Sequence, residues 1–203
     1  MAKIKHTKNE LKAQTDALKR FQRFLPMLQL KKQQLQAEIA AISAKLADVQ
    51  EREAAARQRL ESWVALYADS DVSPEQLVAF EGIKTTQGNI AGVAIPIYEG
   101  IAATPAVLDP YRTPAWTDDA QDMLAALAAL RAEGEVLERQ RELVREELYT
   151  TGQRVNLFEK VKIPECKENI RVIRIFIGDE QTAAVVRGKI AKGRTPKKEE
   201  VTE

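Results

Sequence analysis

The strongest constraint on the fold is a long run near the start of the chain in which apolar residues recur alternately every three and every four positions. This spacing places them on one stripe of a helix and is typical of a left-handed coiled-coil seam rather than of a globular-domain helix. Fourteen of seventeen such positions are apolar. The seam positions are Leu11, Gln14, Leu18, Phe21, Leu25, Leu28, Lys32, Leu35, Ile39, Ile42, Leu46, Val49, Glu53, Ala56, Leu60, Trp63 and Tyr67. We therefore predict one helix over residues 8–67, about 90 Å long at a rise of about 1.5 Å per residue.

The start of this helix and one interruption are also visible in the sequence. Thr7 and Glu10 fit a capping box, in which each side chain accepts a hydrogen bond from an amide of the first turn. Pro26 lies inside the pattern, but Leu25 and Leu28 stay in phase on either side of it. Because proline removes a donor and crowds the preceding turn, we expect a helix kink at Pro26 rather than a break.

A second seam of the same kind lies in the C-terminal half. Its positions are Met123, Leu127, Leu130, Gly134, Leu137, Arg141, Val144, Leu148, Thr151, Val155 and Phe158. The next apolar position after Phe158 is five residues on, at Ile163, and the spacing of three and four then resumes through Cys166 to Ile177. Pro164 falls at this jump of phase, and we expect a helix kink at Pro164 that absorbs it.

The composition changes between the two seams. Residues 74–114 hold five of the eight prolines and four of the nine glycines. Ser73 and Pro74 predict the start of a short helix through Phe80. Alternation over Asn89–Ile97 predicts a strand or small hairpin, with Pro96 at a sheet edge.

Two long helices joined by a compact insertion bury both seams only if they run antiparallel. We therefore predict a mainly α protein, a long antiparallel two-helix left-handed coiled coil with a small central insertion made of a short helix and a β-hairpin or strand. The expected organisation is an N-terminal helix over residues 1–67, the insertion over 68–117, a C-terminal helix over 118–192 and a disordered tail over 193–203.

The net charge of +1 hides an uneven distribution. Nine basic residues against two acidic ones give residues 1–35 a balance of +7, and twelve against five give residues 154–198 the same balance. Residues 61–122 carry two basic and ten acidic residues, a balance of −8. No apolar run approaches the roughly 20 residues of a membrane span, and the first ten residues lack a signal-peptide core, so we expect a soluble protein without direct membrane insertion.

Side chains with reactive or metal-binding chemistry are few and isolated. His6 is the only histidine, which disfavours a typical zinc or copper site. Cys166 falls on the second seam, which favours a buried structural thiol over a nucleophile, and a single cysteine fits a reducing compartment. Gly188 and Lys189 lack the other residues of a phosphate-binding loop. The basic ends have little aromatic interleaving, so we expect no catalytic, cofactor or metal site and no nucleic-acid partner.

Four segments resemble the D subunit of the V-type and the archaeal and bacterial A-type rotary ATPases. The segment Arg154-Val155-Asn156, Glu159, Ile163-Pro164, Glu168 and Ile170 is similar to the C-terminal signature of that family. The other three, in the same order as in the family, are Thr7 with Glu10 and Leu11, Leu28 with Lys31 and Leu35, and Asn89-Ile90 with Gly92, Val93, Ile95 and Pro96. Together these segments span nearly the whole chain.

The resemblance implies a non-catalytic central rotor shaft that transmits torque between ATP hydrolysis or synthesis in a catalytic hexamer and ion translocation by a membrane ring. It implies a cytoplasmic location, peripheral to the membrane. The implied partners are the nucleotide-binding A and B subunits of the hexamer, the small F subunit of the rotor, and a socket-like C or d subunit that links to the ring.

The resemblance also suggests which residues meet those partners. The basic tip expected to face the hexamer comprises Lys3, Lys5, Lys8, Lys12, Lys189, Lys192 and Arg194. Arg154, Asn156 and Glu159 are expected to mark the region that docks the small rotor subunit. Simpler explanations stay open, since exposed charges also serve solubility and Val155 also serves helix packing.

Two other functions share parts of this pattern. A coiled-coil chaperone or scaffold would have the same antiparallel helices but expose apolar tips, whereas the tips here are rich in lysine. The central shaft of F-type ATPases carries an inserted domain of well over a hundred residues, whereas about fifty separate the helices here.

Overall fold

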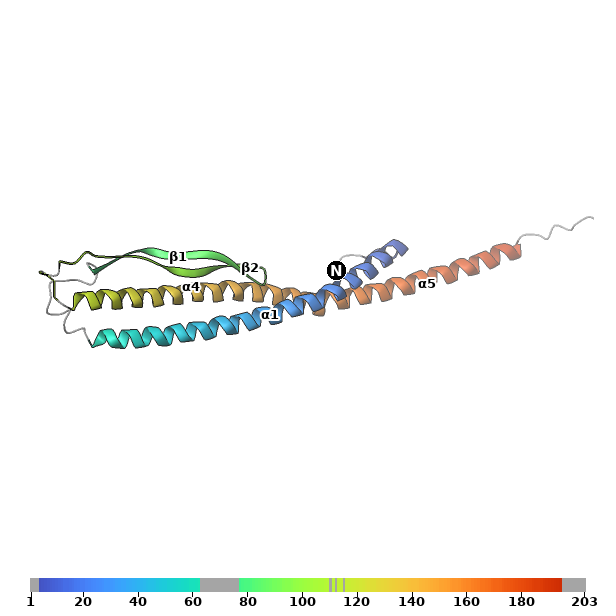
Figure 1. Ribbon diagram of the computed structural model, residues 1–203. Coiled ribbons are helices and arrows are strands. Elements are labelled where there is room, and N and C mark those ends of the chain that lie inside the picture. Colours follow the sequence, from blue (N-terminus) through green and yellow to red (C-terminus); the bar gives the residue numbers. More distant parts are fainter. Residues whose placement is uncertain (1–3, 63–76, 110, 112, 115, 195–203) are drawn as a thin grey trace, which may run out of the picture. The chain divides into compact units, whose positions relative to one another are not determined.

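The computed structural model describes residues 4–62, 77–109, 111, 113–114 and 116–194. The chain is mainly helical, with helices α1 (Lys8–Glu61), α4 (Thr117–Asn156) and α5 (Ile163–Arg194), and a π-helical turn η1 (Leu157–Lys162) between α4 and α5 (Figure 1). Strands β1 (Val78–Ile90) and β2 (Val93–Pro105) form an antiparallel sheet. The chain forms two compact units, named here the terminal unit (Met1–Leu30 with Gly152–Glu203) and the hairpin unit (Lys31–Thr151).

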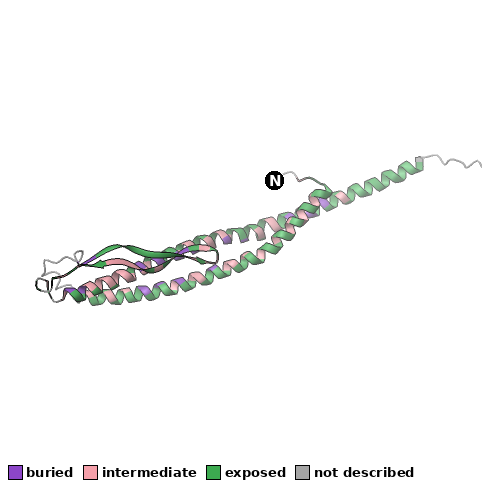
Figure 2. Cartoon of the chain, turned by 45° about the horizontal axis from the view of Figure 1, so that its top comes forward, coloured by how far each residue is buried: buried purple, intermediate pink, exposed green. Residues whose placement is uncertain are grey.

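The burial of side chains confirms both predicted seams. Every seam position from Leu11 to Leu60 and from Met123 to Phe158 is buried or half-buried. Purple and pink residues accordingly follow one another along the helices in Figure 2. Trp63 and Tyr67, the last two positions of the first seam, lie outside the described residues. The apolar period of the sequence thus selects the buried face of each helix.

In the hairpin unit, α1 and α4 lie side by side and run in opposite directions (Figure 1). Lys31 pairs with Glu147, and Val49 lies against Gly134, so residue numbers rise along α1 as they fall along α4. The core between the helices holds Leu35, Ile42, Leu46 and Val49 of α1 with Leu137 and Val144 of α4. The predicted antiparallel packing is therefore present in this unit.

The terminal unit shows the same antiparallel order. The rings of Phe21 and Phe158 lie 5.0 Å apart, and those of His6 and Phe176 lie 4.9 Å apart. On the α5 side, the seam residues Cys166, Ile170 and Ile173 are buried and Ile177 is half-buried. From residue 178 to 193 every side chain of α5 is exposed.

The start of α1 is as predicted at Thr7 but not at Glu10. The Thr7 hydroxyl accepts a hydrogen bond from the Glu10 backbone N–H at 3.2 Å, which satisfies one free amide of the first turn. The Glu10 carboxylate instead accepts a bond from the Gln14 side chain at 2.9 Å, and the Thr7 N–H donates to the Lys5 carbonyl at 3.1 Å. The reciprocal half of the capping box was therefore a wrong prediction.

The central insertion differs from the sequence prediction in two places. The short helix expected through Phe80 is wrong over Val78–Phe80, which begins β1, and residues 73–76 lie outside the described residues. The small hairpin that the sequence offered as one alternative is present, but its turn, at Ala91 and Gly92, falls inside the strand expected over Asn89–Ile97. Both turn residues have positive φ, 51° and 85°, which fits the two-residue loop that matches the twist of a hairpin. Ala91 stands where such turns usually have Asn or Gly, so the sequence did not reveal the position of the turn.

Each strand of the hairpin carries one β-bulge. The register skips Glu81 on β1, between Phe80 and Gly82, and Glu99 on β2, between Tyr98 and Gly100. Gly82 and Gly100 have φ of 152° and 147°, a region that favours glycine. The repeated Glu-Gly pair therefore marks the two irregular points of an otherwise continuous ladder.

The hairpin packs on a second buried face of α4, which the sequence did not reveal. Ile90, Val93 and Ile95 near the turn join the core between the helices. At the base of the hairpin, Leu77 and Val78 pack with Ala120. Since this face of α4 contains Ala, Gln and Glu among its residues, its apolar period is weaker than that of the seam.

Candidate subunit-docking surfaces

The predicted basic tip lies in the terminal unit, at both ends of the chain. Lys5, Lys8 and Lys12 are exposed, before and within the first turns of α1. One open groove is lined by the segment His6–Lys8 and by five residues of α5, Phe176, Ile177, Glu180, Gln181 and Ala184. Lys189 and Lys192 are exposed on α5 beyond this groove, Arg194 is its last residue, and Lys3 lies outside the described residues. The lysines therefore follow one another along the helices instead of forming one cluster.

The three residues expected to dock a companion subunit lie where α4 meets η1. Arg154, Asn156 and Glu159 are all exposed, whereas Val155 between them is buried in the seam. At about 100° per residue within α4, Arg154 points about 160° away from Asn156, whereas Glu159 lies in the π-helical turn, which has more residues per turn. The three residues therefore do not all point to the same side of the helix.

The π-helical turn is the feature of this region that the sequence analysis missed. The Ile163 N–H donates to the Phe158 carbonyl, five residues before it, where an α-helix would bond to the fourth. This turn takes up the five-residue step of the seam from Phe158 to Ile163, which was the signal for it. Pro164 follows as the second residue of α5, and Pro26 lies within α1, which continues through it.

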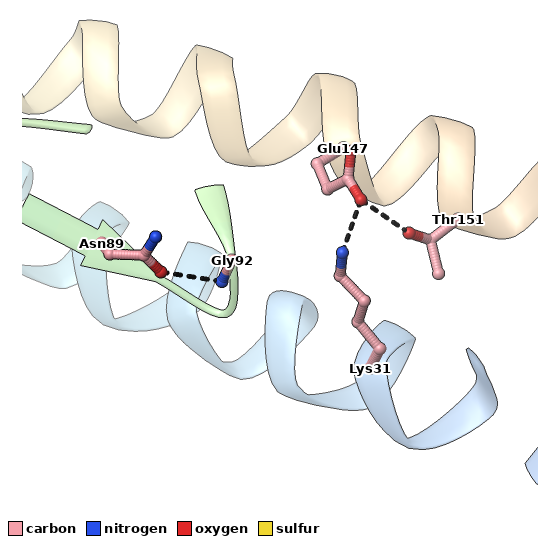
Figure 3. Close-up of polar contacts among 5 residues, drawn as sticks. All are labelled: Lys31, Asn89, Gly92, Glu147 and Thr151. Carbon is pink, nitrogen blue, oxygen red and sulfur yellow. Dashed lines mark hydrogen bonds and ion pairs between the residues drawn. The ribbon is translucent and has the colours of Figure 1, made fainter. Parts of the chain in front are cut away.

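Residues of two family-like segments make polar contacts in the hairpin unit. Figure 3 shows Lys31 of α1 reaching Glu147 of α4, with Nζ and Oε1 2.6 Å apart. The buried Thr151 hydroxyl donates to the same oxygen at 3.5 Å. In the hairpin turn, the Gly92 N–H donates to the Asn89 side-chain oxygen at 2.9 Å, which fixes the turn conformation. Glu147 lay outside the predicted set, because its position beside the seam resembles an ordinary surface site.

Two glutamine side chains hold the hairpin on α4 by hydrogen bonds to its backbone. Gln140, which is buried, donates to the Pro96 carbonyl at 2.5 Å. Gln121 donates to the Leu77 carbonyl at 2.6 Å and to the Ala106 carbonyl at 3.0 Å. These bonds tie carbonyls near both ends of the hairpin to α4, and the Leu77 carbonyl also accepts from the Ala106 N–H at 2.9 Å. No pattern of spacing in the sequence distinguishes these two glutamines from exposed ones.

The shifted ionisation constants in these units have local causes. Burial raises the pKa of the Cys166 thiol, and the nearby Glu165 carboxylate raises it further against the opposite effect of Lys162. Burial also raises the pKa of Tyr98, with a smaller contribution from Glu133. Cys166 therefore stays a neutral thiol on the buried seam, unlike a reactive cysteine. Among the described residues, no group of three or more His, Cys, Asp or Glu side chains is placed to hold a metal ion.

These observations define the class of protein: paired antiparallel helices that share a long apolar seam, with a β-hairpin folded onto one of them. Comparison with known sequences identifies the family. The profile of the ATP synthase D-subunit family matches residues 10–193, so the chain belongs to that family.

Curated relatives cover nearly the whole chain. The D subunit of the V-type ATP synthase of Borreliella burgdorferi is 44% identical over 200 residues, 98% of each chain. The D subunit of the V-type ATP synthase of Chlamydia pneumoniae is 31% identical, over 93% of this chain and 91% of the relative. In the part of the chain that the structure describes, no helix is long and apolar enough to cross a lipid bilayer.

Proposed function

We propose that this protein is the non-catalytic central rotor shaft of a V/A-type rotary ATPase. In this role it transmits torque between ATP hydrolysis or synthesis in the catalytic hexamer and ion translocation by the membrane ring. The observation that carries the proposal is the pairing of two long helices along a buried apolar seam, in a chain of the D-subunit family. Burial along the seam resists separation of the helices under load, and its spacing favours a left-handed supercoil.

The charges and exposed side chains support an assignment of surfaces to partners. The tip lysines Lys5, Lys8, Lys12, Lys189 and Lys192, with Lys3 and Arg194, face the A and B subunits of the hexamer. Arg154, Asn156 and Glu159, which lie on more than one side of the helix, dock the small F subunit of the rotor. The hairpin unit lies toward the socket-like C or d subunit and the ring. The protein acts in the cytoplasm, peripheral to the membrane, and carries no catalytic group itself.

An asymmetric shaft explains how one chain acts on several equivalent catalytic sites. As it turns, each site meets a different side of it, and differential contact holds the sites in different conformations. The hairpin on one face of α4, and the proline-containing segments of both helices, make the sides of the shaft different. Torque transmission then needs only stiffness and contact, not chemistry.

The tip assignment is tested with the assembled complex. Removing residues 188–203 leaves the buried seam intact, because that seam ends at Ile177. We expect assembly to persist while ATP-driven ion pumping falls relative to ATP hydrolysis. The matched comparison is the double variant Lys189→Glu and Lys192→Glu against Lys167→Glu, which alters an exposed charge outside the tip. Full coupled activity in both tip variants would refute the assignment.

A further inference from the structure

The C-terminal helix carries two apolar stripes in two different registers. The buried stripe starts five residues after Phe158 and comprises Ile163, Cys166, Ile170, Ile173 and Ile177. If the spacing of three and four had continued through Phe158 without the extra residue, the stripe would have been Lys162, Glu165, Asn169, Val172, Phe176, Asp179, Ala183, Val186 and Ile190. From Val172 onward the positions of this alternative stripe are apolar as well, apart from Asp179.

The apolar members of the alternative stripe are exposed in the structure. Val172 is 39% exposed and Phe176 is 47% exposed, and Val186 and Ile190 are each at least half exposed. The ring of Phe176 is covered in part by His6. Ile175 and Val185, which lie outside this stripe, are exposed as well. Val172 and Phe176 are therefore the apolar residues that can replace Ile173 and Ile177 against α1.

The π-helical turn sets which register is used. It adds one residue to the helix between Phe158 and Ile163, and one residue corresponds to about 100° of rotation. If residues 157–162 became α-helical, the start of α5 would rotate by that angle about its own axis. Val172 and Phe176 would then face α1 in place of Ile173 and Ile177.

We propose that η1 is a two-position register switch, in which the π-helical turn can relax to an α-helix and rotate the following helix against α1. Every residue of η1 is exposed or half-buried, so little packing at the turn itself opposes the change. The contact of Phe158 with Phe21 fixes the N-terminal part of the turn against α1, and the buried seam residues from Cys166 onward fix the helix that follows it. In the rotated state, the contact between His6 and Phe176 is broken.

Two local features favour the observed register. The alternative would place Lys162, Glu165 and Asn169 against α1, and buried charges and amides are costly. It would also place Pro164 inside a plain α-helix, where its ring crowds the carbonyl of Lys160. The rotated register is therefore the minor state. By rotation alone, it would present a different side of α5 to a surrounding subunit. That last consequence rests on the rotor function, whereas the switch itself does not.

Disulfide trapping in the full-length protein tests the switch without the other subunits. Gln14 is the seam residue seven positions before Phe21, and Cys166 lies eight positions after Phe158, so the two occupy the same level of the antiparallel pair. Gln14→Cys should therefore form a disulfide with Cys166 in the observed register. Copper–phenanthroline serves as the oxidant, and the cross-linked chain is identified by its mobility on a non-reducing gel.

Two further variants report the rotated register and its control. Both carry Gln14→Cys and Cys166→Ala, and one adds Glu165→Cys while the other adds Lys167→Cys. These two positions lie about 100° to either side of Cys166, so ordinary breathing of the seam exposes them alike. If the rotated register is populated at about 0.1–10%, the Glu165→Cys pair should form its disulfide about 10- to 1000-fold more slowly than the pair with Cys166. It should still form its disulfide faster than the Lys167→Cys pair. Equal rates for the two flanking pairs would overturn the proposal.

A shortened helix shows whether the π-helical turn causes the difference. Deleting Lys160 together with Pro164→Ala gives an α-helix in which the buried stripe already faces α1. The pair of Gln14→Cys with Cys166 should still form, and the advantage of Glu165→Cys over Lys167→Cys should disappear. If that advantage persists in a variant with unchanged helical content by circular dichroism, the turn is not the switch. A shortened variant that fails to fold leaves the comparison of the two flanking pairs to decide.

Discussion

Gly134 is a seam position at which alanine should stabilise the protein. A Cβ atom added there would meet only Val49, at 3.8 Å, which is an ordinary van der Waals contact. In a helix interior, glycine is less favourable than alanine by about 0.8–1.0 kcal/mol, because the unfolded chain loses more freedom. We therefore expect Gly134→Ala to raise the free energy of unfolding by about 1 kcal/mol.

The assay is thermal unfolding followed by circular dichroism at 222 nm, with urea unfolding as a second measure. A gain of about 1 kcal/mol corresponds to a rise in melting temperature of about 2–4 °C for a chain of this size. The matched control is Gly88→Ala in β1, where the added Cβ would lie inside the contact radius of the Ile97 side chain. That substitution should raise the melting temperature less than Gly134→Ala does, because the partly exposed Ile97 side chain must move aside. A lower melting temperature for Gly134→Ala would mean that the helices approach more closely at Gly134 than the structure shows.

Three further predictions follow from burial, hydrogen bonds and ionisation. Leu35→Ala removes a fully buried side chain from the core and should cost about 2–5 kcal/mol, whereas the exposed Leu30→Ala should change stability by less than about 0.5 kcal/mol in urea unfolding. Gln121→Ala removes two hydrogen bonds at the base of the hairpin, so hydrogen exchange measured by mass spectrometry should become faster in β1 and β2 but not in α5. Burial raises the pKa of the Cys166 thiol in the folded protein. The stability that the neutral thiol contributes is therefore fully present below about pH 8.5, the pKa of an unfolded cysteine, and is lost as the pH rises through the folded pKa. Cys166→Ala should lessen the loss of stability above about pH 8.5.

The sequence predicted the helical part of the fold well because the seams repeat over many turns. A spacing of three and four that persists from Leu11 to Leu60 leaves little choice of buried face, and the same holds from Met123 to Phe158. The N-cap at Thr7 was also correct, because it rests on one local interaction. Long-range information was not needed for either.

The insertion was predicted less well because its structure depends on contacts with α4. Most of β1 is exposed and lacks a clear alternation, so only pairing with β2 and packing on α4 define it. The turn places Ala91 at a positive φ, against its local preference, and the Asn89 side chain compensates by accepting from Gly92. Here tertiary packing decides what local propensity leaves open.

The predicted docking residues whose side chains the structure describes lie on the surface, but their grouping could not be derived from the sequence. The lysines of both chain ends were assigned to one tip because antiparallel helices bring the termini to the same end. The structure describes α5 as continuing well past the groove lined by His6–Lys8, so the basic residues follow one another along the axis. The length by which α5 extends beyond α1 depends on where α1 begins, and the N-cap at Thr7 determines that start.

The proline in the middle of a long helix is best explained by the step in the seam. A helix that must advance by five residues between Phe158 and Ile163 to keep its apolar face on α1 has already lost the regular bonding to the fourth residue before. Pro164, which cannot donate a backbone hydrogen bond, therefore costs less directly after this turn than it would in a regular α-helix. If the step were the cause, Pro164→Ala should leave the π-helical turn in place, whereas shifting the apolar residues by one position should remove it. Backbone chemical shifts of Leu157–Lys162 distinguish these outcomes, and loss of the turn in Pro164→Ala alone would assign the cause to the proline.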